Sequence, residues 1–464
     1  MPSFPFDPTE DPRVAISTLS AEYAGLGDAR IKRAIQNVSE ALGWTSDRRG
    51  AFGNVIPKGA RVVVKPNFVL HENQGGGGFL PLITHPSLVV AAVEEALRAE
   101  PSELIVGDAP VQSCEFQELV QKTGLDNWSD RLREIEPRFK GIVDFRRTIA
   151  KFRNGTRQAD ENVRGEENYV LFKLGVDSLL EPLTDDGNNF RVTCYDPRLM
   201  AKTHSSGNHQ YLIAKEIIDA DVIINIPKLK THKKAGITGA LKNLVGINGN
   251  KEYLPHHRVG GSASGGDCYP GRNPAKRMLE SVLDFQNTAR TKGGQRLFSG
   301  LAGHLERSIR LTGDKIGVEG SWIGNQTVPR MTLDLNRILL YGRANGTLGT
   351  GVQRQILNIV DAVIAGQGDG PLAPDALEMG LIFAGHNAAA LDRFGAEQLG
   401  YDPEKIPLLE LAFQEFKWPV TRFAVGALDC QWVPSAETPV DGNRKNVISA
   451  NVPAGWMDAL RRAP

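Results

Sequence analysis

The densest group of side chains that could do chemistry is the segment 227–234, which reads PKLKTHKK. It follows an apolar run, 221–226, that is typical of a buried parallel strand. Basic side chains just beyond the carboxyl end of such a strand are well placed to hold a carboxylate or a phosphate. A solvated basic loop is the alternative. We expect Lys228 and Lys230 to act on a small anion, with His232 as a general acid or base.

Further polar residues follow the ends of other predicted strands. Thr238 could cap a helix, whose free N–H groups and dipole would favour an anion. The glycines of a phosphate-binding GxxxxGK[ST] loop are absent. The residues expected to bind the substrate are Lys65, Asn67, Thr238, Lys242, Asn243 and Arg258.

Several histidines lie in predicted loops or at the ends of elements, whereas a packing histidine more often lies within an element. His85 shares the expected acid–base role with His232. No HxxxH or HExxH spacing is present, so each histidine could instead serve in hydrogen bonding or proton transfer. A mixed nitrogen and oxygen site for a divalent or transition metal could be built from Asp108, Asp369, His204, His209, His256 and His257.

Two aspartates have distinctive neighbours. Asp369 lies among three glycines in the segment 366–371, GQGDGP, which would expose its carboxylate to a ligand or a metal; a tight turn is the alternative. Asp392 lies in a predicted helix of small residues, either as a buried partner for a lysine or as part of the polar face.

The elements that must position these residues alternate between strand and helix patterns. The first third predicts strands at 62–64 and 104–106 with a helix at 87–99 between them. The loops 65–67 and 107–110 then leave the same, carboxyl edge of a parallel sheet. From about 131 to 198 the pattern changes to alternating segments separated by polar loops, at 142–145, 169–174 and 190–195.

The remaining chain returns to an α/β pattern. It predicts a strand at 221–227, a glycine-rich loop at 247–273, helices within 274–310 and 327–342, and a final strand–loop–strand–helix unit at 356–399. We predict an α/β fold of mostly parallel sheets with flanking helices. It comprises a first α/β lobe (1–130), an antiparallel β insertion (131–205) and a second α/β lobe with helical segments and glycine-rich loops (206–464).

The ordered set of loops resembles a known family. The motifs KPN at 65–67, THP at 84–86, GD at 107–108, PKLKTH at 227–232, TG at 238–239, KN at 242–243 and GDGP at 368–371 are similar to those of the domain-of-unknown-function 362 (DUF362) family. The likeness runs from about residue 60 to 400 and implies a fold and a site, but no reaction. The loops are more remotely similar to the nickel-dependent lactate racemases, whose histidines move a proton next to a carboxylate.

Many relatives in the DUF362 family carry an appended ferredoxin-like module with two four-iron clusters. This chain has four cysteines, Cys114, Cys194, Cys268 and Cys430, and no CxxC pair. We therefore expect no iron–sulfur cluster and no disulfide framework.

Composition narrows the classes of partner. The 464 residues include 54 Lys plus Arg and 54 Asp plus Glu, so the formal net charge is zero, which argues against nucleic acid or a membrane surface as a partner. The amino-terminal residues lack the pattern of a signal peptide, and no apolar run approaches the roughly 20 residues of a membrane span. A cytoplasmic protein is expected, and a homodimer stays open.

These observations favour an enzyme that acts on a small anionic metabolite, a carboxylate or a phosphate, with a possible setting in secondary metabolism. The lysines and histidines indicate metal-assisted or Lys/His-assisted proton transfer of the isomerase, epimerase or lyase type. One alternative is a metal- or flavin-dependent oxidoreductase. Another is a protein that binds an anion or a cofactor without catalysis.

Overall fold

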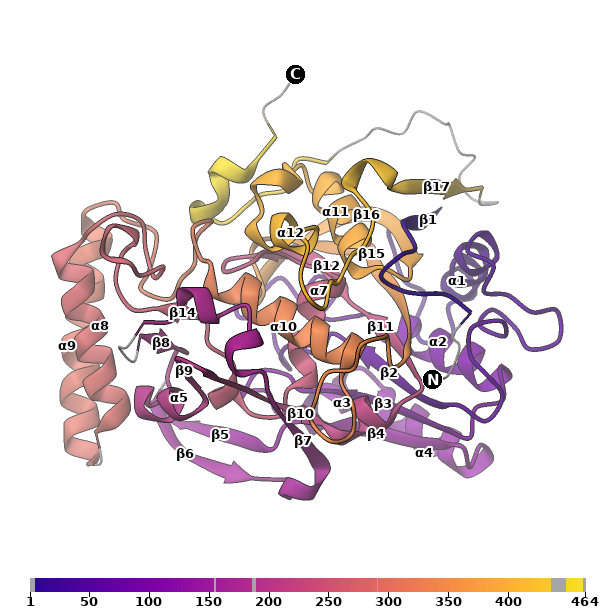
Figure 1. Cartoon of the computed structure of the whole chain (residues 1–464), viewed down its shortest axis with the longest axis horizontal. Helices are drawn as coiled ribbons and strands as arrows, with labels where there is room; N and C mark the ends of the chain where they lie inside the picture. The colour runs from indigo at the N-terminus through magenta and orange to yellow at the C-terminus, as the bar shows by residue number, and fades with distance from the viewer. Residues whose placement is uncertain (1–4, 154–155, 186–188, 290, 435–447, 462–464) are drawn as a thin grey trace.

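The computed structural model describes residues 5–153, 156–185, 189–289, 291–434 and 448–461 (Figure 1). Its centre is a ten-stranded, mostly parallel sheet with helices on both faces, so the predicted α/β class is confirmed. In spatial order the sheet contains β17 (Asp429–Val433), β1 (Arg13–Thr18), β16 (Ala373–Gly385), β15 (Gln355–Asp369), β11 (Val222–Ile226), β2 (Arg61–Pro66), β3 (Glu103–Asp108) and β4 (Phe139–Asp144), with β12 (Lys228–His232) and β13 (Gly236–Thr238) beside the far half of β15.

The parallel part of the sheet runs from β15 through β11, β2 and β3 to β4. Its strands are continuous apolar runs because both faces of the sheet are covered. In β2, Val62 and Val64 pack into one core, whereas Val63 between them packs into the core on the opposite face. Strands 62–64 and 104–106 and the helix between them are therefore confirmed as β2, β3 and α2.

Helices cover both faces of this sheet. On the face of Val62 and Val64 lie α1 (Ala29–Ala41), α2 (Pro86–Arg98), α3 (Phe116–Lys122) and α4 (Leu125–Ile135). On the face of Val63 lie α6 (Lys215–Asp219), α7 (Ala240–Asn243), α10 (Thr327–Tyr341), α11 (Ala388–Gln398) and α12 (Pro407–Ala412). The loops at the carboxyl ends of the parallel strands lie between these two layers of helices.

One sheet holds strands from residues 1–130 and from residues 206–464, the two segments predicted as separate lobes. The prediction that 142–145 belongs to the antiparallel insertion is wrong, because β4 pairs in parallel with β3 at the edge of the central sheet. The insertion itself is antiparallel. It contains the hairpin of β5 (Thr148–Arg153) and β6 (Thr156–Asn162), the strands β7 (Tyr169–Lys173), β8 (Phe190–Arg191) and β9 (His204–Ser205), and α5 (Pro197–Thr203). Strands β7 and β9 pair with β10 (Asn208–Ala214), and β8 pairs with β14 (His257–Arg258), so two strands from beyond the predicted boundary at residue 205 complete it.

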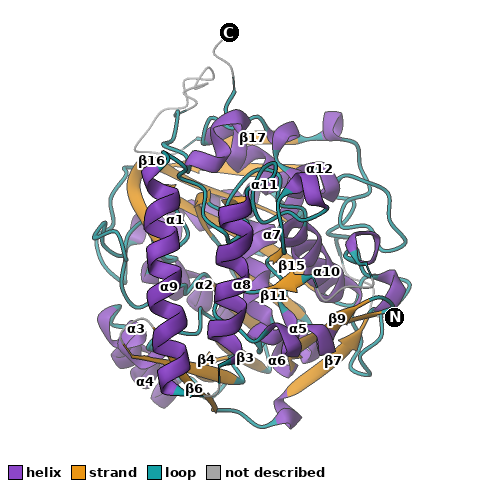
Figure 2. Ribbon diagram, turned by 90° about the vertical axis from the view of Figure 1, so that its left-hand side faces the viewer, coloured by secondary structure: helices purple, strands orange, loops and turns teal. Residues whose placement is uncertain are grey.

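A helical hairpin of α8 (Pro274–Thr288) and α9 (Lys292–Leu311) packs on the side of the molecule (Figures 1 and 2). It has a small core of its own, formed around Cys268, Tyr269 and Leu279. Short 3-10 turns complete the described chain: η1 (Glu166–Asn168), η2 (Gly175–Asp177), η3 (Glu181–Leu183), η4 (Leu244–Ile247), η5 (Lys251–Tyr253), η6 (Ser262–Ser264), η7 (Pro403–Lys405), η8 (Val425–Ala427) and η9 (Ala454–Ala459).

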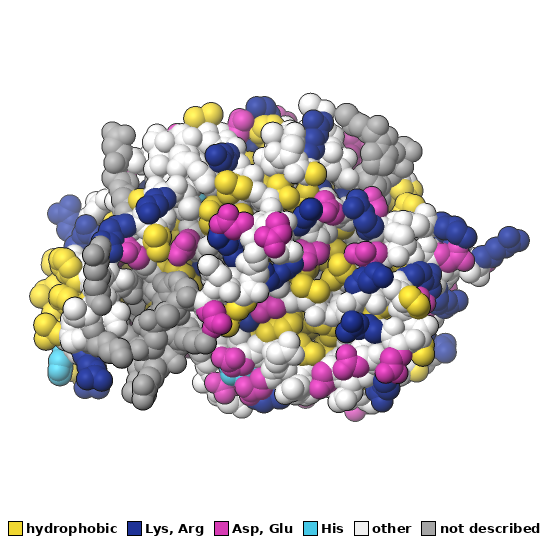
Figure 3. All heavy atoms as spheres, turned by 90° about the horizontal axis from the view of Figure 1, so that it is seen from below, with side chains coloured by type: hydrophobic (Ala, Val, Ile, Leu, Met, Phe, Trp, Pro, Cys, Tyr) yellow, Lys and Arg dark blue, Asp and Glu magenta, His cyan; other side chains and the backbone are white. Residues whose placement is uncertain are grey.

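The surface carries charges of both signs. Figure 3 shows acidic and basic side chains interspersed over the face seen from below, in keeping with the zero net charge. In the part of the chain that the structure describes, we find no helix with the length and apolar character that crossing a membrane requires.

Candidate anion-binding site

The segment 228–232 forms strand β12. Its five residues are buried, so the prediction of a basic loop after β11 is wrong. Pro227 lacks an N–H and interrupts the pairing, but its carbonyl accepts a hydrogen bond from the Asp361 N–H at 2.9 Å, and β12 continues along the far half of β15. The lysines of this segment are consequently inside the protein, where each needs a partner for its charge.

Lys228 has such a partner. Its Nζ lies 2.6 Å from Asp361 Oδ2 and donates to Tyr23 Oη at 3.0 Å and to the Ile364 carbonyl at 3.0 Å. Tyr23 Oη in turn donates to Asp361 Oδ1 at 2.6 Å. Lys228 and Asp361 are both fully buried, so the carboxylate neutralises the ammonium and no positive charge is left for a ligand.

His85 belongs to the same group. Its backbone N–H donates to Asp361 Oδ2 at 2.9 Å, and its ring stacks on Tyr23 with centroids 3.7 Å apart. Its Nδ1 accepts from the Ser87 N–H at the start of α2, which confirms the helix start predicted there. Burial lowers the pKa of His85 to about 4. The structure therefore places His85 as a helix cap beside the Lys228–Asp361 pair.

Lys65 is also paired. At the end of β2 its Nζ lies 2.7 Å from Asp108 Oδ1, and Asp108 accepts further hydrogen bonds from the N–H groups of Phe68 (2.7 Å) and Ala109 (2.9 Å). Gly246 packs so tightly on this pair that a Cβ there would lie 2.0 Å from Asp108 Oδ1. These contacts make Lys65 and Asp108 part of the internal scaffold.

A chain of buried amides continues from this pair. Asn243 Nδ2 donates to Asn225 Oδ1 at 2.8 Å, and Asn225 Nδ2 donates to Asn358 Oδ1 at 2.8 Å. Asn67 is tied through its backbone N–H to Thr84 Oγ1 at 2.8 Å, but its own Oδ1 has no partner among the described residues. Of the predicted binding residues, Asn243 thus holds neighbouring strands together.

Three other lysines have no carboxylate within 4 Å in the described parts of the chain. Lys230, on β12, is fully buried, and its Nζ donates to the Leu82 carbonyl. Lys242 and Lys251 are only partly buried. Burial, followed by neighbouring positive charges, lowers the pKa of Lys230 far below its ordinary value and that of Lys242 to about 7. Burial lowers the pKa of Lys251 to about 8.

Two histidines near these lysines are held in opposite tautomers. His232 Nδ1 accepts hydrogen bonds from the N–H groups of Lys234 (3.0 Å) and Ala235 (3.2 Å), so the proton of the neutral ring is on Nε2. His256 Nδ1 lies 2.7 Å from the Leu254 carbonyl, which can only accept, so Nδ1 carries the proton and Nε2 has a free lone pair. His232 therefore offers a donor at Nε2, and His256 offers an acceptor.

Five side chains form one electrostatic group, which we call the basic cluster: Lys230, His232, Lys242, Lys251 and His256. Lys234 also acts on His232, Lys242 and His256, but it lies 3.8 Å from Glu319 and is therefore not counted in the cluster. Burial is the main cause that lowers the pKa of His232 and of His256, and the charges of the cluster lysines lower it further. Thr238 lies opposite Lys230 on β13, and its buried hydroxyl has no partner among the described residues. Basic groups without a carboxylate partner, beside a hydroxyl without a hydrogen-bond partner, are the arrangement expected for an anion site.

The helix N-terminus after Thr238 is already occupied. Helix α7 has only four residues, its cap is Gly239, and the Asp392 carboxylate accepts hydrogen bonds from the N–H groups of Ala240 and Leu241. The prediction that Thr238 caps a helix with a free anion seat is wrong for this reason. A Cβ at Gly239 would lie 2.1 Å from Asp392 Oδ1, so glycine makes room for this carboxylate.

The residues predicted to hold a metal do not converge. Asp108 is paired with Lys65, whereas Asp369 is exposed and lies 3.3 Å from Lys233. His204 Nδ1 and His209 Nδ1 lie 3.1 Å apart on β9 and β10, away from the other candidates. His256 belongs to the basic cluster. Of the six, His257 contributes to a group of possible ligands, together with two residues that the sequence did not indicate.

The sequence motifs misplaced one basic residue, Arg258, and did not indicate another, Lys251. Arg258 lies 3.6 Å from Asp267 and is not among the charges that act on the cluster lysines. Lys251, which we did not predict, lies in the glycine-rich loop 247–273, and so does His256. That loop therefore contributes two basic side chains to the basic cluster. Its position directly after the KN motif at 242–243 was the available signal.

A cavity of about 810 Å³ lies elsewhere, between the insertion, the C-terminal segment and helices α8 and α9. None of the five residues of the basic cluster lines it. Lys233, Asp369 and His257 do line it, so the candidate residues predicted from the sequence are divided between two places.

Comparisons with known proteins agree with the resemblance in sequence. A family model described as "Domain of unknown function (DUF362)" matches residues 145–397. The "Thylakoid-associated protein sll1697" of Synechocystis sp. is 23% identical over 360 residues, which are 78% of this chain and 69% of that protein.

Two solved structures are similar at 12% identity. One is a protein from Thermotoga maritima, with a TM-score of 0.33 over 81% of this chain and 60% of that one. The other is the lactate racemase apoprotein from Thermoanaerobacterium thermosaccharolyticum, with a TM-score of 0.32 over 83% of this chain and 57% of that one. The chain thus spans less than two thirds of the length of either.

Proposed function

The chain belongs to the DUF362 family, and on the strength of its basic cluster we propose that it binds a small anionic metabolite and moves a proton next to the anionic group. The reaction class would be that of an isomerase, an epimerase or a lyase. The ligand would enter at the partly buried residues Lys242, Lys251 and His256 and reach the buried Lys230.

One observation carries this proposal: five basic side chains lie together with no acidic partner within 4 Å among the described residues. Each lysine loses hydration when it is buried, and the neighbouring positive charges add repulsion. A bound carboxylate or phosphate would supply the missing negative charge and restore the protonated lysines. Lys65 and Lys228 would gain little from a bound anion, because each already has a carboxylate as its counter-charge.

The two tautomers supply an acid and a base. His256 Nε2 has a free lone pair and would take the proton from the carbon next to a carboxylate, since the C–H electron pair can move into that carboxylate. His232 Nε2–H and the Lys230 ammonium would stabilise the resulting enediolate oxygens. Return of the proton from His256 gives back the substrate, and delivery of a proton to the opposite face by the Lys242 ammonium would give its epimer. Loss of a neighbouring leaving group from the enediolate would give a lyase product.

Deuterium exchange tests the proposal directly. The full chain would be incubated in D2O with a panel of 2-hydroxy carboxylates, and NMR would follow loss of the carbon-bound hydrogen next to the carboxylate. We expect exchange with at least one of them, and at least about 100-fold slower exchange in His256→Ala. His304→Gln, an exposed histidine on α9, is the matched control and should exchange at the rate of the unaltered protein.

The same panel separates the proposal from its alternatives. Calorimetry would measure binding of each carboxylate and of inorganic phosphate. Binding without exchange for any member of the panel would contradict the enzyme and favour a protein that only carries an anion. A flavin or ferric absorption band in the purified protein would instead favour an oxidoreductase.

A further inference from the structure

A second group of chemically active side chains lies outside the basic cluster. A ring nitrogen of His257, Sγ of Cys268 and a carboxylate oxygen of Glu280 all lie within 4.8 Å of one another. His257, on β14, and Cys268 both come from the glycine-rich loop 247–273, and Glu280 comes from α8, so the fold of that loop onto the helix brings the three together.

All three side chains are buried. His257 is 5% exposed and its Nδ1 has no hydrogen-bond partner among the described residues, while Cys268 is fully buried. Glu280 is 5% exposed, and its Oε1 accepts a hydrogen bond from the Gly260 N–H at 2.8 Å, which fixes the orientation of the carboxylate. A buried imidazole with an unpartnered nitrogen, grouped with a thiol and an oriented carboxylate, is a polar cluster that an ion would satisfy.

The donor set indicates the kind of ion. Nitrogen, thiolate sulfur and carboxylate oxygen together suit a borderline-soft ion that accepts tetrahedral geometry. We propose that His257, Cys268 and Glu280 form a zinc site with three protein ligands. Around a tetrahedral zinc, ligand atoms lie about 3.3–3.8 Å apart, so these side chains would close by at most about 1.5 Å on binding.

Zinc binds cysteine as the thiolate, so binding would release the proton of the Cys268 thiol. Cys268 forms no disulfide.

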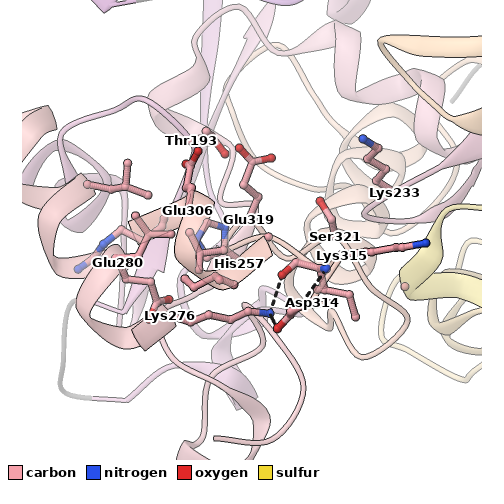
Figure 4. A pocket seen from close by; sticks show the side chains of 18 of the residues that line it. Thr193, Lys233, His257, Lys276, Glu280, Glu306, Asp314, Lys315, Glu319 and Ser321 are labelled. Atoms are coloured by element: carbon pink, nitrogen blue, oxygen red, sulfur yellow. Dashed lines mark hydrogen bonds and ion pairs between the residues drawn. The ribbon is translucent and has the colours of Figure 1, made fainter. Parts of the chain in front are cut away.

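The fourth position of such an ion would be open. His257 and Glu280 both line the cavity of about 810 Å³ beside α8 and α9 (Figure 4). Three protein ligands with a vacant fourth position are typical of zinc that binds water or a ligand oxygen, in contrast to closed structural sites with four protein ligands. Lys276 is paired with Asp314 at 2.6 Å (Figure 4), whereas the Arg277 guanidinium lies 3.5 Å from Glu280 Oε2, so the ion would share this carboxylate with Arg277.

This site is separate from the basic cluster, although His256 and His257 are neighbours in sequence. Successive side chains of extended backbone point to opposite sides. His256 acts with the lysines of the cluster, whereas His257 lies at the cavity beside α8. Anion binding and zinc binding can therefore fail independently, and each can be tested without the other.

Metal analysis of the full chain tests the site. The protein would be loaded with Zn²⁺, dialysed against a weak chelator and analysed by mass spectrometry. Loading with Co²⁺ would report the ligands by absorption. We expect one tightly held zinc ion per chain and a thiolate-to-cobalt charge-transfer band. Loss of all zinc on dialysis, or a cobalt spectrum without that band, would overturn the proposal.

Variants identify the ligands. Cys268→Ser should abolish the charge-transfer band, and His257→Gln and Glu280→Gln should each weaken zinc binding by at least about 10-fold. Cys194→Ser is the matched control, since Cys194 lines the same cavity but is not one of the three residues. Circular dichroism would establish that each variant is folded. Zinc affinities of folded Cys268→Ser and His257→Gln equal to that of the unaltered protein would contradict the assignment.

Discussion

Lys228 and Lys230 are two residues apart on the same buried strand, yet the structure gives them different surroundings. Lys228 lies 2.6 Å from Asp361 and also donates to Tyr23, whereas the charge of Lys230 meets the Leu82 carbonyl and no carboxylate within 4 Å among the described residues. The same contrast separates Lys65, paired with Asp108, from Lys242. A buried lysine with its own carboxylate serves the fold, and one without it is available to a ligand.

The largest expected effect tests the paired side of this contrast. Lys228→Met leaves the Asp361 carboxylate buried without its counter-charge, so we expect the free energy of unfolding to fall by about 3–5 kcal/mol. Denaturant titration of the full chain would measure it. The double variant Lys228→Met/Asp361→Asn is the control, because it removes the stranded charge and should recover part of the loss. Unchanged stability in Lys228→Met would remove the distinction between paired and unpaired lysines.

The same substitution at the lysine without a carboxylate, Lys230, should weaken anion binding and not lower stability. Lys230→Met removes a buried group that has no counter-charge, so the free energy of unfolding should stay the same or rise. The affinity for a small carboxylate or phosphate should fall about 10–100-fold, which corresponds to about 1.4–2.8 kcal/mol. Calorimetry and denaturant titration would measure the two quantities on the same sample. A large loss of stability with unchanged affinity would assign Lys230 to the fold.

The parallel strands of the sheet could be predicted from the sequence, whereas the strand that carries Lys228 and Lys230 could not. The β-branched runs of β2, β3 and β11 predicted the parallel core because strands buried on both faces are apolar throughout. The extension of the sheet by β12 was not predicted, since its lysines and histidine read as polar loop residues. Pairing with the far half of β15, more than 120 residues away, is a tertiary effect that local pattern does not contain.

The sequence predicted several residues of the basic cluster, but it predicted the role of only some of them. Lys230, His232, Lys242 and Thr238 were named from the motifs and lie together, as the ends of neighbouring strands require. Asp361, which neutralises Lys228, lies within the apolar strand β15, and nothing in its neighbours marks it as a partner. Lys251 and Cys268 come from the glycine-rich loop, whose path depends on the packing around it.

The pH dependence should differ between stability and binding. The pKa of Lys242 is about 7 in the folded protein and that of Lys251 about 8, below their ordinary value of 10.5. At a pH between the folded pKa values and 10.5, these two lysines bind more protons in the unfolded chain than in the folded protein. The ligand-free protein should therefore become more stable as pH rises from about 7 to about 10. Anion affinity should fall several-fold over about pH 7 to 9, as the lysines lose their charge. Parallel trends in the two measurements would contradict the assignment, and Lys242→Met should flatten both.

The smallest effect concerns two threonines beside Lys230: Thr231 is the next residue on β12, and Thr238 lies opposite Lys230 on β13. Thr238 has a buried hydroxyl without a partner among the described residues, whereas Thr231 Oγ1 donates to the Gly368 carbonyl at 2.7 Å. Thr238→Val should leave the free energy of unfolding unchanged or slightly higher and weaken anion binding about 2–10-fold, if its hydroxyl donates to the ligand. Thr231→Val should instead lower stability by about 1 kcal/mol and leave the affinity intact. Calorimetry on both variants would show whether the Thr238 hydroxyl contacts the ligand. Equal affinities of the two variants would place the ligand away from β13 and confine the site to Lys242, Lys251 and His256.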